Sequence, residues 1–435
     1  MTFARWREDG FDAEFVAAEL AKGIKPVSSG RGLVYSGNAF FGDPLTLLEA
    51  GVDFEVPIAD GDRSRIITSA LEAALRSTDY GARALIREIN KATRDFSRLP
   101  EKKYIVATRL SFAHFEDISR RESSGSRLYV RRKLPHYLAE THEEAKRQIG
   151  SNVVHDYLNR GHSEEYAAAW IHVAGRSLPE AVQRAGEALD LRRSIWNFAL
   201  NRRSGRPFPP PSRGPLNEVL AGPAFSLHHP DGALAGEPAW FDPQYAEPQH
   251  SYKLQEKWDE VRKDEEGIRL VLKRSPYRTT LEDSLRRYSR ALDMADLSNS
   301  FLNMWSLIET LTGITPRDTH DKVVKRAAFV YRSRERKTEE QVLHHLRRYR
   351  NSYVHSGEDS DQTGAYLHQL RGQTEQLLKF HLNHSRYFAS LEEAAQFLDL
   401  PHTTQDIQQL IDRKVREAEE AQKTVRLAKK GLRFS

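Results

Sequence analysis

The feature that most constrains the fold of this chain is a nearly unbroken series of helix patterns that begins at Thr280. Apolar side chains recur three and four residues apart, so each segment has one apolar stripe to bury. One segment stops at Gly313 and Pro316 follows, as is typical where a helix ends. Thr338 and Gln341 have capping-box spacing and predict where the fourth helix starts. The patterns predict helices near residues 281–295, 301–312, 320–332, 338–354 and 361–384. Regular helices with short connections predict an antiparallel bundle over residues 279–388.

The fourth predicted helix ends in a group of polar side chains. Asn351 and His355 are one turn apart and share a face, which Arg347 joins. Arg350 lies five residues before His355 and points about 140° away from it on a straight helix. One phosphate can therefore meet Arg350 and His355 only through a kink, at a helix end, or across two chains. Gly357 offers the helix end.

These residues carry a family resemblance. Arg350-Asn351-x-x-x-His355 followed by glycine resembles the Arg-x4-His motif of the HEPN ribonucleases, in the form of the Apea-like HEPN group. The segment Phe301–Glu309 is similar to the family's aromatic-rich helix that ends in an acid. The resemblance covers residues 274–385. It implies a HEPN-like helical bundle with Arg350, Asn351 and His355 as catalytic residues, acting as a homodimer.

The bare spacing of the motif is weak by itself. It occurs three times, at Arg109/His114, Arg131/His136 and Arg350/His355. The first pair lies in a strand pattern, where residues at odd separation point to opposite faces. Pro135 interrupts any helix at the second pair. Only the third pair combines the spacing with an asparagine, a helix and a following glycine; a solvated basic helix face is the alternative interpretation.

Other polar residues are expected to support this site. Since an arginine held against an apolar stripe needs an acceptor, the resemblance suggests that Glu309 orients Arg350; an exposed helix glutamate is the alternative. Arg347 and Arg348 add positive charge beside the motif, as weak RNA contacts. The predicted helix 404–430 ends in a basic tail whose Lys429 and Lys430 could contact an RNA backbone. A solvated surface helix or a packing arm is the alternative there.

Composition narrows the class of protein. The 435 residues include 66 Lys and Arg against 61 Asp and Glu, so the net charge of +5 favours an anionic partner only weakly. Without cysteine, the chain has no disulfide framework, thiolate metal site or thiol nucleophile. The N-terminus lacks the apolar core of a signal peptide, and no apolar run reaches membrane-spanning length. We expect a soluble, cytoplasmic protein without membrane association.

The rest of the chain predicts an α+β protein overall, with a mixed α+β N-terminal region before the all-α bundle. Residues 1–142 combine strand patterns near 52–58, 104–112 and 126–134 with helix patterns near 64–78 and 79–96. This region is either a regulatory or RNA-positioning module or a scaffold. Residues 143–278 form a predicted helical and hairpin connection that contains a proline-rich loop at 206–223. Residues 389–435 form predicted C-terminal helices.

Two histidine pairs have spacings that metal sites use. His228 and His229 precede a Pro-Asp-Gly turn pattern, and a surface turn is the better interpretation because no second pair stands nearby. His381 and His384 have helical ligand spacing but no third ligand. No metal or other cofactor is therefore expected.

The predicted function is that of a metal-independent endoribonuclease. The 2′-hydroxyl of RNA would attack the neighbouring phosphate, with His355 moving protons and Arg350 stabilising the crowded phosphate. Asn351 would hold a phosphate oxygen or orient the histidine. The resemblance adds a toxin-like role in antiviral defence by abortive infection, with an inhibitory or activating protein partner. A non-catalytic RNA- or nucleotide-binding module and a helical interaction scaffold are the alternatives.

Overall fold

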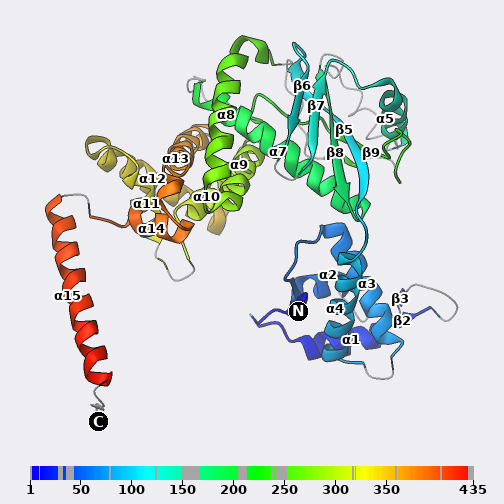
Figure 1. Ribbon diagram of the computed structural model, residues 1–435, viewed down its shortest axis with the longest axis horizontal. Helices are drawn as coiled ribbons and strands as arrows, with labels where there is room; N and C mark the ends of the chain where they lie inside the picture. Colours follow the sequence, from blue (N-terminus) through cyan, green and yellow to red (C-terminus); the bar gives the residue numbers. More distant parts are fainter. Residues whose placement is uncertain are drawn as a thin grey trace. The chain divides into compact units, whose positions relative to one another are not determined.

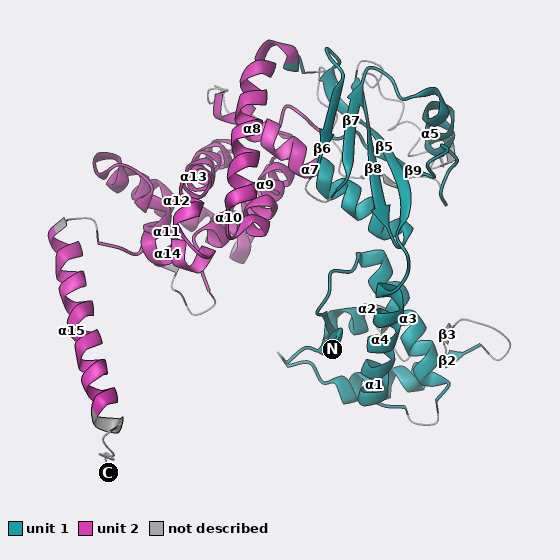
Figure 2. Cartoon of the chain, in the orientation of Figure 1, with its two compact units in different colours: residues 1–189, 221–243, 249–254 teal, residues 190–220, 244–248, 255–435 magenta. Residues whose placement is uncertain are grey.

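The chain divides into two compact units, which Figure 2 shows in different colours. Unit 1 comprises residues 1–189, 221–243 and 249–254, and unit 2 comprises residues 190–220, 244–248 and 255–435. The structure, a computed structural model, describes residues 2–8, 10–27, 33–35, 44–77, 80–122, 125–148, 166–203, 213–236, 240–241, 252–315, 318, 320–357, 360–401 and 404–429. Unit 1 carries a sheet and unit 2 is helical in its described parts, so the α+β prediction is confirmed.

The first part of unit 1 is a small helical layer with short strands. Its elements are β1 (Ala4–Trp6), α1 (Ala13–Gly23), β2 (Ile24–Pro26), β3 (Leu33–Tyr35), α2 (Pro44–Gly51), β4 (Val52–Phe54), α3 (Asp60–Leu75) and α4 (Ala82–Ser97). Strands β1 and β4 pair antiparallel, and so do β2 and β3. Leu20, Ile67, Leu71 and Leu85 are fully buried in the core that these helices share. The predicted strand at 52–58 ends at Phe54, before Pro57.

The second part of unit 1 is an antiparallel sheet. Its strands are β5 (Lys102–Ala113), β6 (Ile118–Arg121), β7 (Arg127–Arg131), β8 (Tyr166–Gly175), β9 (Ala224–His228) and β10 (Trp240–Phe241). The described strands lie in the order β10-β9-β5-β8-β7-β6, and Figure 1 shows the longer ones side by side. Helix α5 (His136–Gln148) packs Leu138 against Ile105, Ala107 and Trp170 on one face of the sheet.

The predicted connecting region at 143–278 is not a separate part of the fold. Strands β8 and β9 complete the sheet of unit 1 from within that region. The helical part of that prediction is wrong at residues 166–175, which form β8. A strand that is buried on both faces is continuously apolar, and a buried alanine-rich helix has the same kind of sequence. Helix α7 (Leu178–Arg203) runs across the division between the units at residue 189. Residues 206–212 of the proline-rich loop lie outside the described residues.

Unit 2 is built from helices around one large core. The elements are α8 (Trp258–Arg274), α9 (Arg278–Asp293), α10 (Leu297–Leu311), α11 (His320–Phe329), α12 (Ser333–Ser356), α13 (Thr363–His384), α14 (Leu391–Leu398) and α15 (Thr404–Lys429), with short 3-10 turns at Leu254–Lys257 and Ser385–Tyr387. The core takes side chains from the second half of α7 and from helices α8 to α14, including Phe198, Leu272, Phe301, Leu346 and Leu377. The bundle therefore extends on both sides of the predicted 279–388.

The helix boundaries test the sequence patterns in detail. Helix α10 ends before Gly313, whose φ of +60° is the left-handed geometry expected there. Helix α12 starts at Ser333 rather than at the predicted Thr338, and its N-cap Arg332 makes no side-chain cap bond. The capping-box spacing was therefore misleading, because the polar residues 333–337 before it are also helical. No helix in the described part of the chain is both long enough and apolar enough to cross a bilayer.

Helices α7, α8 and α9 carry charged side chains that pair with one another inside the bundle. Arg192 pairs with Glu265, and both side chains are almost completely buried. Arg193 donates to Asp190 at 2.8 Å and to Asp293 at 2.9 Å. Burial raises the pKa of both aspartates, but Arg193 and Arg290 together outweigh burial at Asp190, whose pKa falls. At Asp293, burial outweighs the effects of Arg193 and of the hydrogen bond from Asn217, so its pKa stays raised. Arg192 and Arg193 therefore contribute to the packing and stability of unit 2.

Candidate active site

Aromatic packing fixes the end of α12 in the bundle. Leu346 is fully buried, and Tyr349, one turn closer to the motif, is half-buried. The Tyr349 ring meets Phe301 of α10 edge-on and Tyr366 of α13 at a tilt, each with centroids 4.9 Å apart. Its hydroxyl lies 2.6 Å from the Thr363 hydroxyl at the start of α13. The apolar stripe therefore holds the residues that follow it at a defined place on the bundle.

The three predicted catalytic residues lie together on the last two turns of α12. Arg350 and Asn351 are half-buried, whereas His355 is exposed. The guanidinium Nη1 of Arg350 donates to Oδ1 of Asn351 at 3.3 Å. Since Asn351 and His355 are four residues apart on a continuous helix, they share a face. The long arginine side chain thus leans from its own face towards theirs.

The helix geometry removes one of the three ways for Arg350 to meet His355. Helix α12 is continuous to Ser356, and Gly357, with a φ of +68°, ends it. The end therefore comes after His355 and not between the two residues. What remains is a bend within the helix, the reach of the arginine side chain towards Asn351, or a second chain.

Glu309 does not pair with Arg350 in the described structure. Its Oε1 accepts a hydrogen bond from the indole Nε1 of Trp305 at 2.8 Å, one turn earlier on α10. Trp305 is buried, so this bond satisfies the only polar atom of its side chain. Among the described residues no ion pair to Arg350 is found. The expected orienting role of Glu309 is replaced here by a contact within its own helix.

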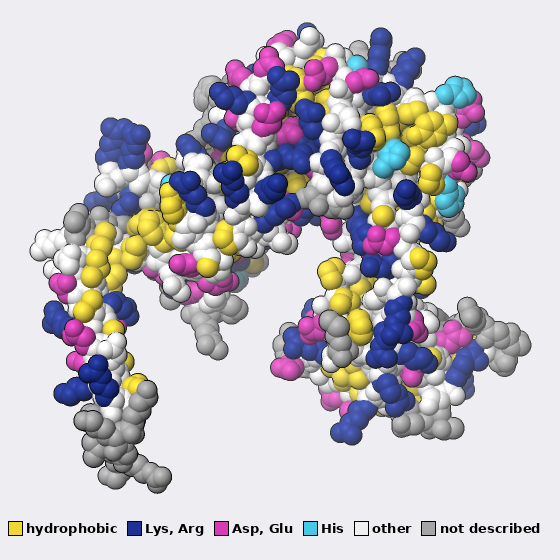
Figure 3. All heavy atoms as spheres, in the orientation of Figure 1, with side chains coloured by type: hydrophobic (Ala, Val, Ile, Leu, Met, Phe, Trp, Pro, Cys, Tyr) yellow, Lys and Arg dark blue, Asp and Glu magenta, His cyan; other side chains and the backbone are white. Residues whose placement is uncertain are grey.

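The weaker RNA contacts have different fates. Arg347 forms an ion pair with Asp321 of α11, and this hydrogen bond lowers the pKa of Asp321. Arg347 is thus engaged rather than available, whereas Arg348 is exposed. Helix α15 is exposed along its described side chains except the half-buried Ile407 and Leu410, and Figure 3 shows basic and acidic side chains interleaved on it. The side chain of Lys429 and the whole of Lys430 lie outside the described residues.

In each histidine pair, one histidine is buried and the other is exposed. His381 is fully buried, with Nδ1 3.1 Å from the Tyr277 hydroxyl and Nε2 2.8 Å from the carbonyl of Leu311. Burial lowers the pKa of His381 to about 4. His228 was expected in a surface turn, but it is the buried last residue of β9 and only His229 is exposed. In the described part of the chain, no three His, Cys, Asp or Glu side chains are grouped as metal ligands would be.

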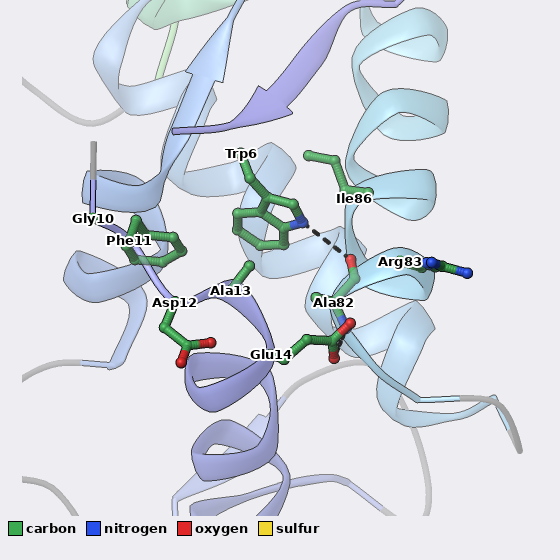
Figure 4. Close-up of a pocket in the computed structure, with 9 residues that line it drawn as sticks. All are labelled: Trp6, Gly10, Phe11, Asp12, Ala13, Glu14, Ala82, Arg83 and Ile86. Carbon is green, nitrogen blue, oxygen red and sulfur yellow. Dashed lines mark hydrogen bonds between the residues drawn. The ribbon is translucent and has the colours of Figure 1, made fainter. Parts of the chain in front are cut away.

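A shallow pocket of about 500 Å³ lies elsewhere, in the helical layer of unit 1. Figure 4 shows Trp6 at its centre, with the indole donating to the carbonyl of Ala82 at 3.2 Å and the ring stacked against Phe11. The carboxylate of Glu14 accepts from the backbone amide of Ala82 at 3.3 Å. These polar groups hold α4 against α1. The pocket contains none of the predicted site residues.

Sequence reasoning missed a second polar surface, on the sheet of unit 1. Arg127, Tyr129 and Arg131 alternate along β7 with the buried Leu128 and Val130. An alternation of this kind is typical of a strand whose outer side chains face solvent. This alternation is visible in the sequence, but Arg131 was considered there only as part of the rejected Arg131/His136 pair. The partner strands that complete the surface could not be identified without the pairing.

Compared with protein-family models, with curated proteins and with solved structures, the chain matches none of them.

Proposed function

We propose that the chain is a metal-independent endoribonuclease of the HEPN type, with Arg350, Asn351 and His355 as its catalytic residues. The observation that carries the proposal is the state of Arg350. It is half-buried at the end of a well-packed helix, makes no ion pair with a described residue, and donates to the neutral amide of Asn351. A cation held in place without an acid partner is suited to bind a phosphate.

The chemistry follows from the three side chains. The 2′-hydroxyl of a ribose attacks the adjacent phosphorus, and the 5′-oxygen leaves, so the products are a 2′,3′-cyclic phosphate and a 5′-hydroxyl. His355 is exposed and can take the proton of the attacking hydroxyl or supply one to the leaving oxygen. Arg350 stabilises the charge that builds on the phosphate oxygens. Asn351 holds the guanidinium and presents its amide NH₂ on the face of His355.

The active form is proposed to be a homodimer. On a continuous helix, Arg350 leans only as far as Asn351, and His355 is one turn further on. A two-fold axis beside the exposed end of α12 would bring the histidine of one chain to the arginine of the other, because such an interface apposes the same patch twice. Mixing Arg350→Ala with His355→Ala protein then restores part of the activity through composite sites. Full activity of a monomer in light scattering would contradict the dimer.

The direct test is RNA cleavage by purified protein. Wild-type protein incubated with total cellular RNA in EDTA should produce cyclic phosphate ends, and His355→Ala should abolish them. His136→Ala is the matched control, because this exposed histidine also follows an arginine by five residues. Cleavage by folded His355→Ala at the wild-type rate would overturn the assignment. Activity that EDTA removes and Mg²⁺ restores would point to a metal mechanism instead.

The biological role is proposed from the resemblance alone. A toxin-like effector in antiviral defence should arrest growth when expressed in cells, and His355→Ala should relieve the arrest. An inhibitory or activating partner would set when the cleavage begins. Growth arrest by the His355→Ala protein as strong as by the wild type would favour the non-catalytic RNA-binding alternative.

A further inference from the structure

One face of the sheet in unit 1 gathers basic and aromatic side chains. Along β7, Arg127 and Arg131 are exposed and Tyr129 is half-buried, while Leu128 and Val130 are fully buried on the opposite face. Side chains alternate between the two faces of a strand. Arg127, Tyr129 and Arg131 therefore point to the same side, opposite the core that Leu128 and Val130 fill. On that side Tyr129 packs against the small cluster that contains Trp170 and Leu138 of α5.

Strand pairing extends this surface over two neighbours. In β8, Trp170 pairs with Tyr129 and His172 pairs with Arg127. In β6, Arg121 also pairs with Arg127. Residues directly opposite each other in an antiparallel pair have side chains on the same face. We call this surface the basic aromatic face; it consists of Arg121, Arg127, Tyr129, Arg131, Trp170 and His172.

The rings of this face are already stacked. Tyr129 lies parallel to Trp170, with centroids 5.3 Å apart and planes at 10°, and His172 meets Tyr129 at 5.2 Å. Trp170 is buried, so it forms a floor, whereas His172 is exposed. The side chains around it remove part of the water from the ring of His172, and this partial desolvation, followed by the charge of Arg127, lowers its pKa. The stack offers flat ring surface at the edge of solvent.

Guanidinium groups accompany the rings. The Cζ atom of Arg127 lies 5.8 Å from the centroid of Tyr129, and that of Arg131 lies 5.7 Å from Trp170. Arg127 makes no ion pair with a described residue. Arg131 contacts the carboxylate of Asp117 at 3.1 Å, with half of each side chain exposed, so water screens this pair. The exposed Arg132 and Lys133 follow β7 directly.

We propose that the basic aromatic face binds single-stranded RNA, with a base stacked beside Tyr129 and the backbone phosphates held by Arg127 and its neighbouring cations. The composition of this face favours this occupant over an acidic peptide. The cations are interleaved with ring surfaces rather than gathered in a purely polar patch, and every base has a flat face to stack on such rings. Duplex RNA buries its bases and cannot use the rings in this way.

The proposed binding at the basic aromatic face is separate from the cleavage proposed for the helical bundle. It gives unit 1 a role in holding substrate that does not depend on whether Arg350 and His355 cut it. Binding and cleavage are therefore measured separately, binding with the full chain carrying His355→Ala and cleavage with the native chain. Binding without cleavage would remove the proposed nuclease and leave the basic aromatic face intact.

The experiment is fluorescence anisotropy with a labelled oligouridylate. In the His355→Ala background, Tyr129→Leu should weaken binding at least about fivefold, because a stacking ring is lost. Tyr129→Phe keeps the ring and should bind like the parent. Arg127→Gln should lower the dependence of log affinity on log salt by about 0.7. Arg87→Gln, an exposed arginine on α4, is the matched control and should change neither quantity.

Folding is checked for each variant by its urea unfolding midpoint. Arg127 is exposed, so Arg127→Gln tests the face even if Tyr129→Leu loses stability. An unchanged affinity in Tyr129→Leu, or an unchanged salt dependence in Arg127→Gln, would overturn the proposal. Duplex RNA that binds as tightly as the single strand would also overturn it, because that result requires charge alone.

Discussion

Arginine occupies two contrasting places in unit 2. Arg193 is buried between Asp190 and Asp293, and each of its ion pairs is closed by a hydrogen bond. Arg350 is half-buried at the end of α12, and it donates a hydrogen bond to the side-chain amide oxygen of Asn351. Burying a charge is costly unless it is paired, and Arg193 is paired with two carboxylates. Arg350 is partly exposed to water, and its guanidinium remains accessible to an anion.

The contrast separates stability from chemistry within one bundle. Removing a buried partner leaves an unpaired charge in the core, whereas removing an exposed one changes little in the fold. The arginines beneath α7 to α9 should therefore decide whether unit 2 folds. The residues at the end of α12 should decide what it does once folded. Four experiments test this division, in order of decreasing expected effect.

The largest effect is expected for Arg193→Met. The change leaves two buried carboxylates facing each other without their shared cation. The expected loss in the free energy of unfolding is about 3–5 kcal/mol, a large part of the stability of an ordinary domain. Urea unfolding followed by circular dichroism measures it. Arg348→Met, at an exposed arginine near the end of α12, is the control and should stay within about 0.5 kcal/mol of the parent. Equal midpoints for the two variants would contradict the division.

Asn351→Asp should give the half-buried Arg350 the acidic partner that the buried arginines have. A carboxylate at this position would bind the guanidinium of Arg350, which already lies 3.3 Å from Oδ1. The arginine would then be neutralised before substrate arrives, and the cleavage rate should fall about a hundredfold, the scale of one lost transition-state donor. Thermal unfolding should hardly change. Asn383→Asp, on the exposed side of α13, is the matched control. Undiminished cleavage would show that Arg350 needs no free charge.

Buried histidines should behave like the buried arginines and affect stability. Burial is the main cause that lowers the pKa of His142 to about 3 in unit 1 and of His381 to about 4 in unit 2. Between pH 6.5 and those values the unfolded chain takes up protons that the folded chain does not. Stability is therefore complete above pH 6.5 and falls on acidification.

The expected loss is about 2 kcal/mol per histidine between pH 7 and pH 5. Urea unfolding at the two pH values measures it for the wild type. His142→Gln and His381→Gln should each reduce the pH dependence, even where they also lower stability at pH 7. His136→Gln, at an exposed histidine, should leave the pH dependence unchanged. A wild-type stability independent of pH in this range would rule out the buried neutral state of both rings.

Periodicity predicted the bundle well because its helices depend on local sequence. The end of α10 at Gly313 and the span of α13 follow from apolar spacing and backbone chemistry within a few residues. The division of the chain could not be predicted in the same way. Strand β8 has an alanine-rich sequence that is equally suited to a helix, and only its pairing with β5 and β7 makes it a strand. Long-range pairing decided the outcome there.

In the candidate site, too, contacts within one helix could be predicted from the sequence, whereas most side-chain partners could not. The closeness of Arg350 to Asn351 and the shared face of Asn351 and His355 follow from helix geometry, which sequence spacing contains. The partner of Glu309 did not follow, because a tryptophan one turn away on the same helix competed for its carboxylate. The pairing of Arg347 with Asp321 depends on how α11 packs on α12. Side-chain partners across elements need the fold first.

The smallest expected effect tests this last pair. Asp321→Asn should release Arg347, which lies on the face of Asn351, and raise the affinity for single-stranded RNA a few-fold in the His355→Ala background. One more phosphate contact should also steepen the dependence of log affinity on log salt by about 0.7. The double variant Asp321→Asn with Arg347→Gln separates two causes. If the gain disappears in it, the released arginine binds RNA. If the gain persists, removal of the aspartate's repulsion explains it, and the face of Arg347 lies outside the RNA path.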